Sequence, residues 1–173
     1  MDGKTVYSAN IGSGDVSVID ARTNRVIRAI PTGRFPSGLA VTPDGASVYV
    51  TKELSGVTVI NAANGTVAAR LREPSPFSVA ISPNGTRAYV TGLGPGSVTA
   101  IHPRTHRSPS PYRRAVRHRP FTVRATGGAV YVANQGANAL PIIDQSTFRT
   151  TATIGTGTSP YGIAIVEPRP TSR

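Results

Sequence analysis

The chain has no cysteine, no tryptophan and a single methionine among its 173 residues. The absence of cysteine excludes disulfides, thiolate metal ligands and a cysteine nucleophile, and it leaves the redox compartment open. Aromatic residues make up only 6% of the sequence. No run approaches the roughly 18 consecutive apolar residues that a membrane helix needs. We therefore expect no membrane span.

Acidic residues are also scarce. There are 8 of them against 19 basic residues, which gives a formal charge of +11, and none lies between Glu73 and Asp144. All the basic residues except Lys4 and Lys52 are arginines. Such an excess is typical of proteins that contact nucleic acid or anionic surfaces. Arginines spread over exposed loops give the same charge without any such partner, so both interpretations stay open.

One pattern recurs along the chain at a spacing of about 41 residues. Each unit holds short apolar, β-branched runs separated by Gly, Pro, Asn or Ser, which predicts an antiparallel four-stranded meander with tight turns. Asp44-Gly45 and Asn64-Gly65 are hairpin-turn pairs that tolerate positive φ. A tyrosine marks the second strand of each unit, at Tyr7, Tyr49, Tyr89 and Tyr131, and a proline opens the next unit, at Pro36, Pro76, Pro120 and Pro160.

Repeats of about 40 residues with four strands each are typical of β-propeller blades. A sheet that is apolar on both faces cannot bury itself alone, and radial stacking places a neighbour about 10 Å away on each side. The predicted fold class is all-β, a β-propeller with four blades of four antiparallel strands. Small residues predict a crowded innermost strand near the axis, at Gly38, Ala40, Ala80, Gly162 and Ala164.

Three motifs resemble the YVTN β-propeller repeat family of bacterial and archaeal surface-layer-type proteins. They are Pro-x-x-x-Ala-Val-x-Pro-Asp-Gly at 36–45, Tyr-Val-Thr at 49–51 and Val-x-Val-Ile-Asp at 16–20. The resemblance covers nearly the whole chain. It implies a WD40/YVTN-like repeat protein that is usually seven-bladed and often secreted, so a partial or truncated seven-bladed propeller stays open. Related propellers include lactonase-type enzymes and subunits of quinone-dependent dehydrogenases, so the resemblance implies no single activity.

The sequence pattern starts at the second strand of one unit and ends at the first strand of another, and this predicts how the units divide. We expect a single domain over 1–166 and a frayed tail at 167–173. The blades are expected at 1–35 plus 160–166, 36–75, 76–119 and 120–159. The N-terminal Met1-Asp2-Gly3-Lys4 leads directly into a strand pattern, so no signal peptide is visible and the localisation stays unassigned.

The last predicted strand can complete the first blade. Ile163 to Val166 is expected as the innermost strand beside Thr5 to Ala9, in this chain or in a partner, because closure removes exposed sheet edges. A homodimer in which two chains form one eight-bladed ring therefore stays open. Prolines between Ser108 and Val116 predict an irregular outer edge in the third blade, because proline cannot donate to a strand ladder.

Basic side chains concentrate between His102 and Arg119. Arginine pairs bidentately with phosphate or carboxylate, so this segment predicts weak polyanion binding. Tyr112 and Phe121 would add stacking on single-stranded nucleic acid. A solvated basic loop is the alternative. The candidate anion-binding residues are Arg104, Arg107, Arg113, Arg114, Arg117 and Arg119.

We predict no catalytic residue, no metal site and no cofactor. His102 and His106 are four residues apart, but no carboxylate is near them in sequence and the surrounding arginines oppose a cation. No Gly-x-Ser-x-Gly elbow is present. The glycines at 92–96 and 155–157 are interpreted as turn glycines, because no helix follows that would bind a phosphate.

The predicted function is that of a non-catalytic binding or scaffold propeller, which presents loops for recognition of a protein or small ligand. A propeller enzyme or enzyme subunit, lactonase-like or quinone-dehydrogenase-like, is the alternative. A remnant of a larger propeller is a third. Whether the chain is an enzyme stays undecided at this level.

If the basic segment is functional, a mobility-shift assay will show weak, sequence-independent binding of nucleic acid that falls steeply with salt. Replacing Arg113, Arg114 and Arg117 with Ser should reduce this binding, because each substitution removes a phosphate contact. No binding at low ionic strength would leave only the solvated-loop interpretation.

Overall fold

The computed structural model describes residues 3–93, 97–107, 113–115, 120–125 and 128–165. Almost all regular structure in these residues is β-strand. In chain order the elements are β1 (Thr5–Asn10), β2 (Asp15–Asp20), β3 (Arg25–Pro31), β4 (Pro36–Val41), β5 (Ser47–Lys52), β6 (Gly56–Asn61), β7 (Val67–Leu71), β8 (Pro76–Ile81), β9 (Ala88–Gly92), β10 (Ser97–Ile101), β11 (Arg113–Ala115), β12 (Pro120–Ala125), β13 (Ala129–Asn134), the 3-10 helix η1 (Gln135–Ala137), β14 (Ala139–Asp144) and β15 (Thr150–Gly155).

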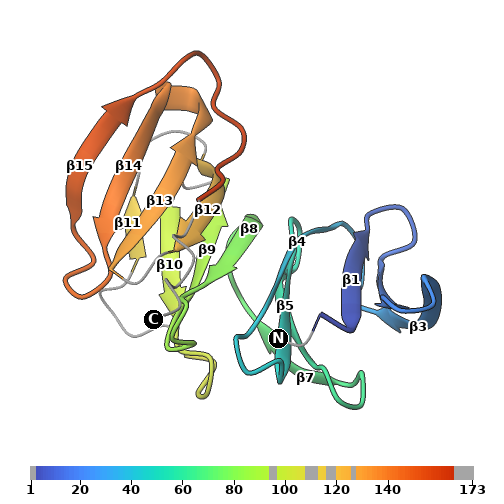
Figure 1. Cartoon of the computed structure of the whole chain (residues 1–173). Helices are drawn as coiled ribbons and strands as arrows, with labels where there is room; N and C mark the ends of the chain where they lie inside the picture. Colours follow the sequence, from blue (N-terminus) through green and yellow to red (C-terminus); the bar gives the residue numbers. More distant parts are fainter. Residues whose placement is uncertain (1–2, 94–96, 108–112, 116–119, 126–127, 166–173) are drawn as a thin grey trace, which may run out of the picture.

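The described strands form four antiparallel sheets. The first sheet has three strands, β1-β2-β3, and each of the others has four, β4-β5-β6-β7, β8-β9-β10-β11 and β12-β13-β14-β15. Figure 1 shows the sheets following one another in chain order, with the first and fourth at opposite ends. We name the strand positions in a four-stranded sheet A to D in chain order, so β1, β2 and β3 occupy positions B, C and D.

The predicted register of the four tyrosines is confirmed. Each tyrosine lies on strand B opposite an apolar residue of strand C, in the pairs Tyr7–Val18, Tyr49–Val59, Tyr89–Ala100 and Tyr131–Ile142. The turn glycines are also where the sequence predicts them, because Gly45 and Gly65 have φ of 71° and 72°. Positive φ is inexpensive for glycine, so these turns close tightly.

Each sheet presents two apolar faces, because successive side chains of a strand point to opposite sides. We call the face that carries the strand B tyrosine the forward face and the opposite one the rear face. The forward face of each of the first three sheets packs on the rear face of the next. Three buried clusters result, represented by Val16, Val18, Val48 and Val50, by Tyr49, Val57, Val90 and Ile101, and by Tyr89, Val98, Val132 and Ile143.

The threonine of the Tyr-Val-Thr motif joins neighbouring sheets. Thr51 Oγ1 accepts a hydrogen bond from the Gly38 amide at 2.8 Å and donates to the Phe77 carbonyl of β8 at 2.7 Å. In the next sheet Thr91 Oγ1 accepts a hydrogen bond from the Ser78 amide in the same way, at 3.0 Å. The pairing of strands A and B shifts at this point, between Pro36 and Leu39 in the second sheet. The threonine hydroxyl therefore replaces a ladder bond that the bulge removes.

Gly38 lies where β4 comes close to β8. A Cβ at this position would stand 2.8 Å from the Phe77 carbonyl oxygen and 3.1 Å from Ser78 Cα. The crowding that the sequence predicts for this innermost strand is therefore present at Gly38. Gly162, its predicted counterpart, has open space around it, since a Cβ there would meet no atom within 4 Å.

The predicted closing strand is wrong within this chain. The described part of that segment, 161–165, is not a strand, and the first sheet has only β1, β2 and β3 among the described residues. Its position explains the difference, since the segment follows the fourth sheet while β1 belongs to the first, at the other end of the molecule (Figure 1). Pairing with a partner chain is left open by this result.

At the outer edge of the third sheet, the described residues include β11 at Arg113–Ala115, which pairs with β10. The prolines at 109 and 111 lie outside the described residues, so the irregular edge expected there stays a prediction. In the part of the chain that the structure describes, no helix is long and apolar enough to cross a membrane.

The contact at Gly38 predicts a specific loss of stability. Gly38→Ala should lower the free energy of unfolding by about 1–3 kcal/mol, because the added methyl group forces β4 and β8 apart. Gly157→Ala is the matched control, since a Cβ there meets no atom within 4 Å. Urea denaturation of the two variants measures the difference, and equal stabilities would contradict the proposed inter-sheet contact.

Candidate binding groove at the turn face

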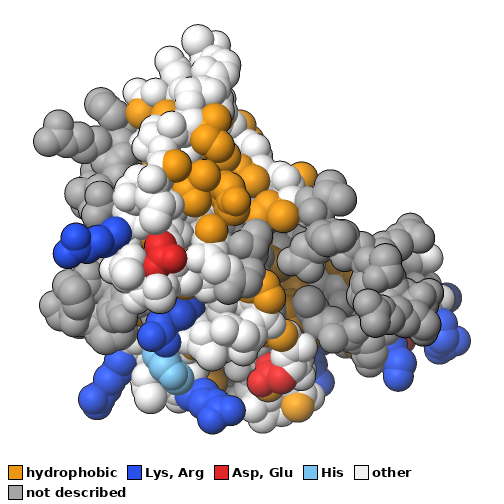
Figure 2. Space-filling view, turned by 60° about the vertical axis from the view of Figure 1, so that its left-hand side comes forward, with side chains coloured by type: hydrophobic (Ala, Val, Ile, Leu, Met, Phe, Trp, Pro, Cys, Tyr) orange, Lys and Arg blue, Asp and Glu red, His pale blue; other side chains and the backbone are white. Residues whose placement is uncertain are grey.

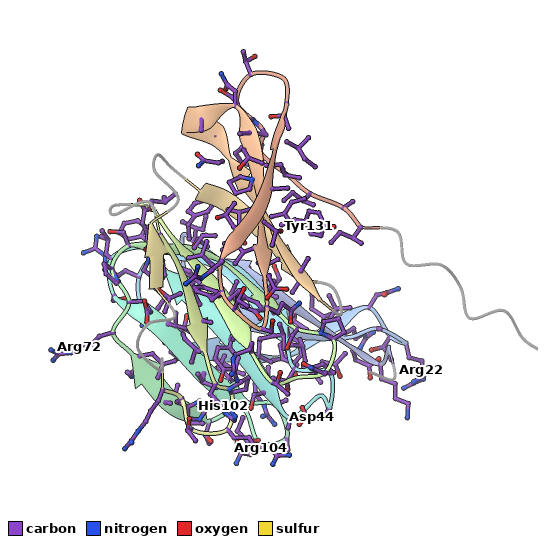
Figure 3. The ribbon with its side chains drawn as sticks, turned by 90° about the vertical axis from the view of Figure 1, so that its left-hand side faces the viewer. Arg22, Asp44, Arg72, His102, Arg104 and Tyr131 are labelled. Atoms are coloured by element: carbon purple, nitrogen blue, oxygen red, sulfur yellow. The ribbon has the colours of Figure 1, made fainter. Side chains whose placement is uncertain are left out.

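The turns between strands A and B and those between strands C and D lie at the same end of each sheet, because the strands alternate in direction. We call this end of the molecule the turn face. Figure 3 shows Asp44, His102 and Arg104 gathered there, whereas Arg72 projects elsewhere and Arg22, from the C–D turn of the first sheet, lies apart from these three. The exposed charged side chains of the turn face come from short hairpin turns whose conformation is held by local hydrogen bonds.

The C–D turns share one design. The residue at the end of strand C accepts hydrogen bonds from the backbone amides two and three positions ahead. Asp20 accepts in this way from Arg22 at 2.9 Å and from Thr23 at 2.8 Å. In the fourth sheet, the Ser146 hydroxyl, followed by the amide and hydroxyl of Thr147, lowers the pKa of Asp144 to about 2. His102 takes this role in the third sheet, where its Nδ1 accepts the Arg104 amide at 3.2 Å.

The residue four positions after this cap has a left-handed conformation in every C–D turn that the structure describes in full. It is Asn24, Gly65, His106 or Phe148, with φ between 54° and 72°. In two cases it meets the strand B tyrosine of the preceding sheet. Phe148 stacks on Tyr89 with ring centroids 6.3 Å apart and an interplanar angle of 12°. His106 meets Tyr49 at the same centroid distance but tilted by 50°.

Tyr49 and His106 also form a hydrogen bond. The Tyr49 hydroxyl lies 3.2 Å from the Pro103 carbonyl oxygen and 3.1 Å from His106 Nδ1. A carbonyl oxygen only accepts, so both contacts are satisfied when Tyr49 donates to Pro103 and His106 Nδ1–H donates to Tyr49. Burial raises the pKa of Tyr49 to about 12, so its hydroxyl keeps its proton at neutral pH. His106 Nε2 is then free of this pairing.

A groove of about 670 Å³ opens beside His106, between the second and third sheets. Three turns line it, and each contributes a proline, Pro43, Pro83 or Pro103. Asp44 and Arg104 supply opposite charges. The Thr42 hydroxyl lowers the pKa of Asp44 most, followed by the Ala46 amide, with a smaller effect from the charge of Arg104. The groove therefore offers a cation, a carboxylate and an imidazole on rigid turns.

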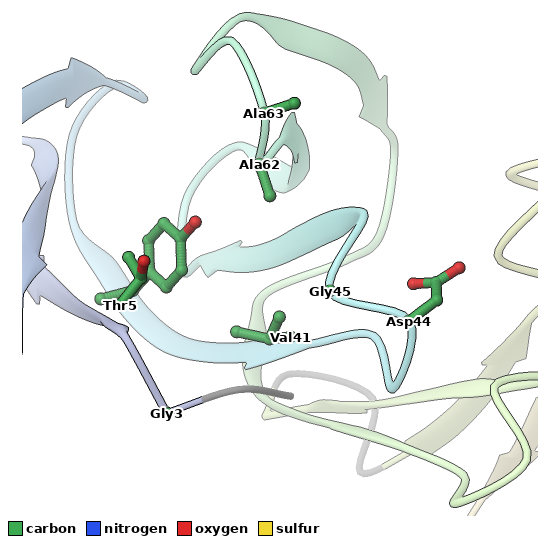
Figure 4. Close-up of a pocket in the computed structure, with 8 residues that line it drawn as sticks. Gly3, Thr5, Val41, Asp44, Gly45, Ala62 and Ala63 are labelled. Atoms are coloured by element: carbon green, nitrogen blue, oxygen red, sulfur yellow. The ribbon is translucent and has the colours of Figure 1, made fainter.

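A second groove of about 500 Å³ lies on the other side of Asp44, between the first and second sheets (Figure 4). It is lined by Tyr7, by Gly3 and Thr5, and by Ala62 and Ala63 of the C–D turn. The left-handed residue of that turn is Gly65. The Arg28 side chain of the first sheet occupies the space beside it, since a Cβ at Gly65 would stand 2.8 Å from Arg28 Cδ.

The predicted anion-binding arginines are brought together only in part. Arg104 and Arg107 are exposed in the C–D turn of the third sheet, and Arg104 lines the larger groove. Arg113 and Arg114 belong to β11, and Arg117 and Arg119 lie outside the described residues. Of the two residues expected to stack, Tyr112 lies outside the described residues and Phe121 belongs to β12. Polyanion binding by this segment therefore stays a prediction.

The two histidines that the spacing places together have separate hydrogen-bonding roles. His102 caps its turn and His106 pairs with Tyr49. Among the described residues no group of three or more His, Asp or Glu is placed to hold a metal ion. Glu53 and Asp144, which the sequence leaves without a role, do not line either groove.

Sequence reasoning missed two features. The first is the contact between Tyr49 and His106, which are 57 positions apart in the sequence. Its only local sign is the left-handed residue four positions after the cap of each C–D turn. The second is Lys52, which is 4% exposed and donates from Nζ to the Thr32 carbonyl at 3.0 Å. Burial, together with the charge of Arg70, lowers the pKa of Lys52. Its role is to join the first two sheets at the end opposite the turn face.

No family model matches the chain. The protein YncE of Salmonella typhimurium is 23% identical over 134 residues, which make up 74% of this chain and 38% of YncE. A chain of Kuenenia stuttgartiensis hydrazine synthase superposes with a TM-score of 0.81 and 24% identity over 88% of this chain and 46% of that chain. A chain of a nidogen/laminin complex superposes with a TM-score of 0.74 and 15% identity over 92% and 63%.

The two solved structures are β-propellers, and this chain has the same all-β fold. At these identities the likeness shows the fold alone. The chain spans 38% of the length of YncE and 46% of the matched hydrazine synthase chain. Because one of these solved proteins is a synthase and the other is held in a complex with a protein partner, the comparisons do not choose between an enzyme and a binding protein.

The Tyr49–His106 contact predicts a measurable loss of stability when the Tyr49 hydroxyl is removed. Tyr49→Phe should lower the free energy of unfolding by about 1 kcal/mol, because the Pro103 carbonyl and His106 Nδ1 lose their partner. Tyr7→Phe is the control, since no described residue bonds the Tyr7 hydroxyl, and it should change stability by less than about 0.5 kcal/mol. Equal effects in chemical denaturation would show that the hydroxyl of Tyr49 does not stabilise the fold.

Proposed function

We propose that the chain is a non-catalytic binding propeller that recognises its ligand in the larger groove of the turn face. We infer that the four sheets are four blades of YVTN type, with the predicted units at 36–75, 76–119 and 120–159. The first unit, predicted at 1–35 plus 160–166, has only its 1–35 part within this chain's first sheet. The observation that carries the proposal is the convergence of Asp44, Arg104 and His106 on one groove, from two turns of neighbouring sheets.

The chemistry of the groove favours a ligand with charges of both signs. Arg104 is exposed and suits a carboxylate or phosphate, whereas Asp44 accepts from an amine or amide. Three prolines give the groove apolar and rigid walls, which lowers the entropic cost of binding. A peptide segment that carries one acidic and one basic side chain meets all of these requirements.

Recognition is favoured because local hydrogen bonds hold the polar side chains of the groove in place. Asp44 Oδ1 accepts from the Thr42 hydroxyl at 2.6 Å and from the Ala46 amide at 3.0 Å. His106 Nδ1 is paired with Tyr49. Groups held in this way keep a fixed orientation, which suits specific binding. A propeller enzyme or enzyme subunit remains the alternative function.

Titration of the ¹⁵N-labelled protein with the capped tripeptide acetyl-Lys-Ala-Glu-amide tests this proposal. We expect chemical-shift changes at the amides of Ala46, Gly85 and Arg104, and smaller ones with acetyl-Ala-Ala-Ala-amide. Arg104→Ser should weaken binding about tenfold, because a charge-assisted hydrogen bond is lost. Arg72→Ser is the control, since Arg72 is exposed and lies away from the groove (Figure 3).

Unchanged affinity in Arg104→Ser would contradict recognition in this groove. Shifts confined to other parts of the molecule, or shifts of the same size with the alanine peptide, would contradict it as well.

A further inference from the structure

The forward face of the fourth sheet has no sheet packed on it in the described residues. Cross-strand pairing places five apolar side chains there, Tyr131, Leu140, Ile142, Ala152 and Ile154. Ile154 is 48% exposed. Figure 2 shows hydrophobic side chains gathered over this sheet. The face is therefore a continuous apolar surface at one end of the row of sheets.

The same positions are covered elsewhere in the chain. Their counterparts in the second sheet are Tyr49, Val57, Val59, Ala69 and Leu71, which pair in the same register. Tyr49, Val57 and Val59 are each 0% exposed, because the rear face of the third sheet lies on them. The uncovered face of the fourth sheet thus has the composition of a buried interface, with a tyrosine and branched aliphatic residues in equivalent places.

The complementary rear face is uncovered on the first sheet. Val6 pairs with Ile19, which pairs with Val26. Val6 is 49% exposed and Val26 is 61% exposed. In the third sheet the pair Ala88–Ile101 occupies the positions of Val6 and Ile19, and these two residues are 0% and 1% exposed. The first sheet therefore presents the surface on which a forward face packs.

Among the described residues the first sheet also has no strand A, and the chain carries a segment with the sequence of one. Residues 160–165, Pro-Tyr-Gly-Ile-Ala-Ile, match Pro36–Val41 of β4 position by position. The described part of this segment pairs with no strand, and Tyr161 is 62% exposed. The match places Ile163 and Ile165 where Leu39 and Val41 pack against the core of the first two sheets.

We propose that the occupant of both uncovered faces is a second copy of this chain. The forward face of the fourth sheet of each copy packs on the rear face of the first sheet of the other. Residues 161–165 of each copy add strand A to the partner's first sheet, beside β1. A twofold axis relates the two identical junctions, so the assembly closes as a ring of eight sheets and leaves no apolar face uncovered.

A second copy fits because this single chain supplies every part of the junction. It carries a forward face, a rear face and the missing strand, and it uses the same contact at its three internal interfaces. The left-handed turn residue fits as well, since Asn24 of the first sheet has the conformation of Phe148, which covers Tyr89. Asn24 of the partner would meet Tyr131 in the same way.

Light scattering of the full chain after size exclusion, at 1–100 µM, tests the assembly. We expect twice the chain mass of 18.0 kDa. Ile142→Glu on the forward face and Val6→Glu on the rear face should each give the mass of one chain, because a carboxylate would be buried in both junctions. Leu54→Glu is the matched control, since Leu54 is 73% exposed on neither face, and it should leave the doubled mass unchanged.

Circular dichroism establishes that the variants are folded, because both substitutions replace side chains outside the three buried clusters. A mass of 18.0 kDa for the unmodified chain at all concentrations overturns the proposal. A doubled mass that Ile142→Glu abolishes but Val6→Glu leaves intact also overturns it, because two forward faces would then pack on each other. A mass above two chains overturns the closed ring. None of these results bears on peptide binding at the turn face, which is measured separately.

Discussion

The structure depends on one constraint, which is that its sheets are apolar on both faces. A sheet of this kind is stable only between two neighbours, so the units must stack. The stacking is reinforced by polar contacts at both ends of the strands. Thr51 bonds the Phe77 carbonyl on one side, and Tyr49 bonds the Pro103 carbonyl on the other. These bonds set the angle and register at which apolar faces, which are themselves non-directional, come together.

The turn face follows from this packing. The left-handed residue of each C–D turn is held by its own turn, and in the third and fourth sheets it meets the tyrosine of the preceding sheet. Phenylalanine there gives a stacked pair, histidine gives a hydrogen bond, and glycine leaves space that the Arg28 side chain fills. One position of the repeat therefore changes the chemistry of the turn face without changing the fold. This variation is the means by which a regular repeat acquires a specific surface.

Much of the fold was predictable from the sequence. The strands, the turns at Gly45 and Gly65 and the register of Tyr7, Tyr49, Tyr89 and Tyr131 all follow from local patterns, because hairpins pair neighbours along the chain. The expected closure by Ile163 to Val166 was wrong within the chain. That contact joins segments more than 150 residues apart in sequence, and no local pattern specifies whether the first sheet is reached. The candidate arginines were only partly informative, since Arg104 lines the larger groove, Arg107 does not line it, and Arg117 and Arg119 lie outside the described residues.

The sequence by itself determined the repeat, the strand order within each sheet and the turns at Gly45 and Gly65, because these depend on residues within about one repeat of each other. Only the tertiary structure decided that His106 meets Tyr49, that Asp44 and Arg104 share a groove, and that the forward face of the fourth sheet is uncovered. Each of these depends on the distance between sheets. That distance is set by the combined volume of side chains from two repeats, which neither repeat specifies alone.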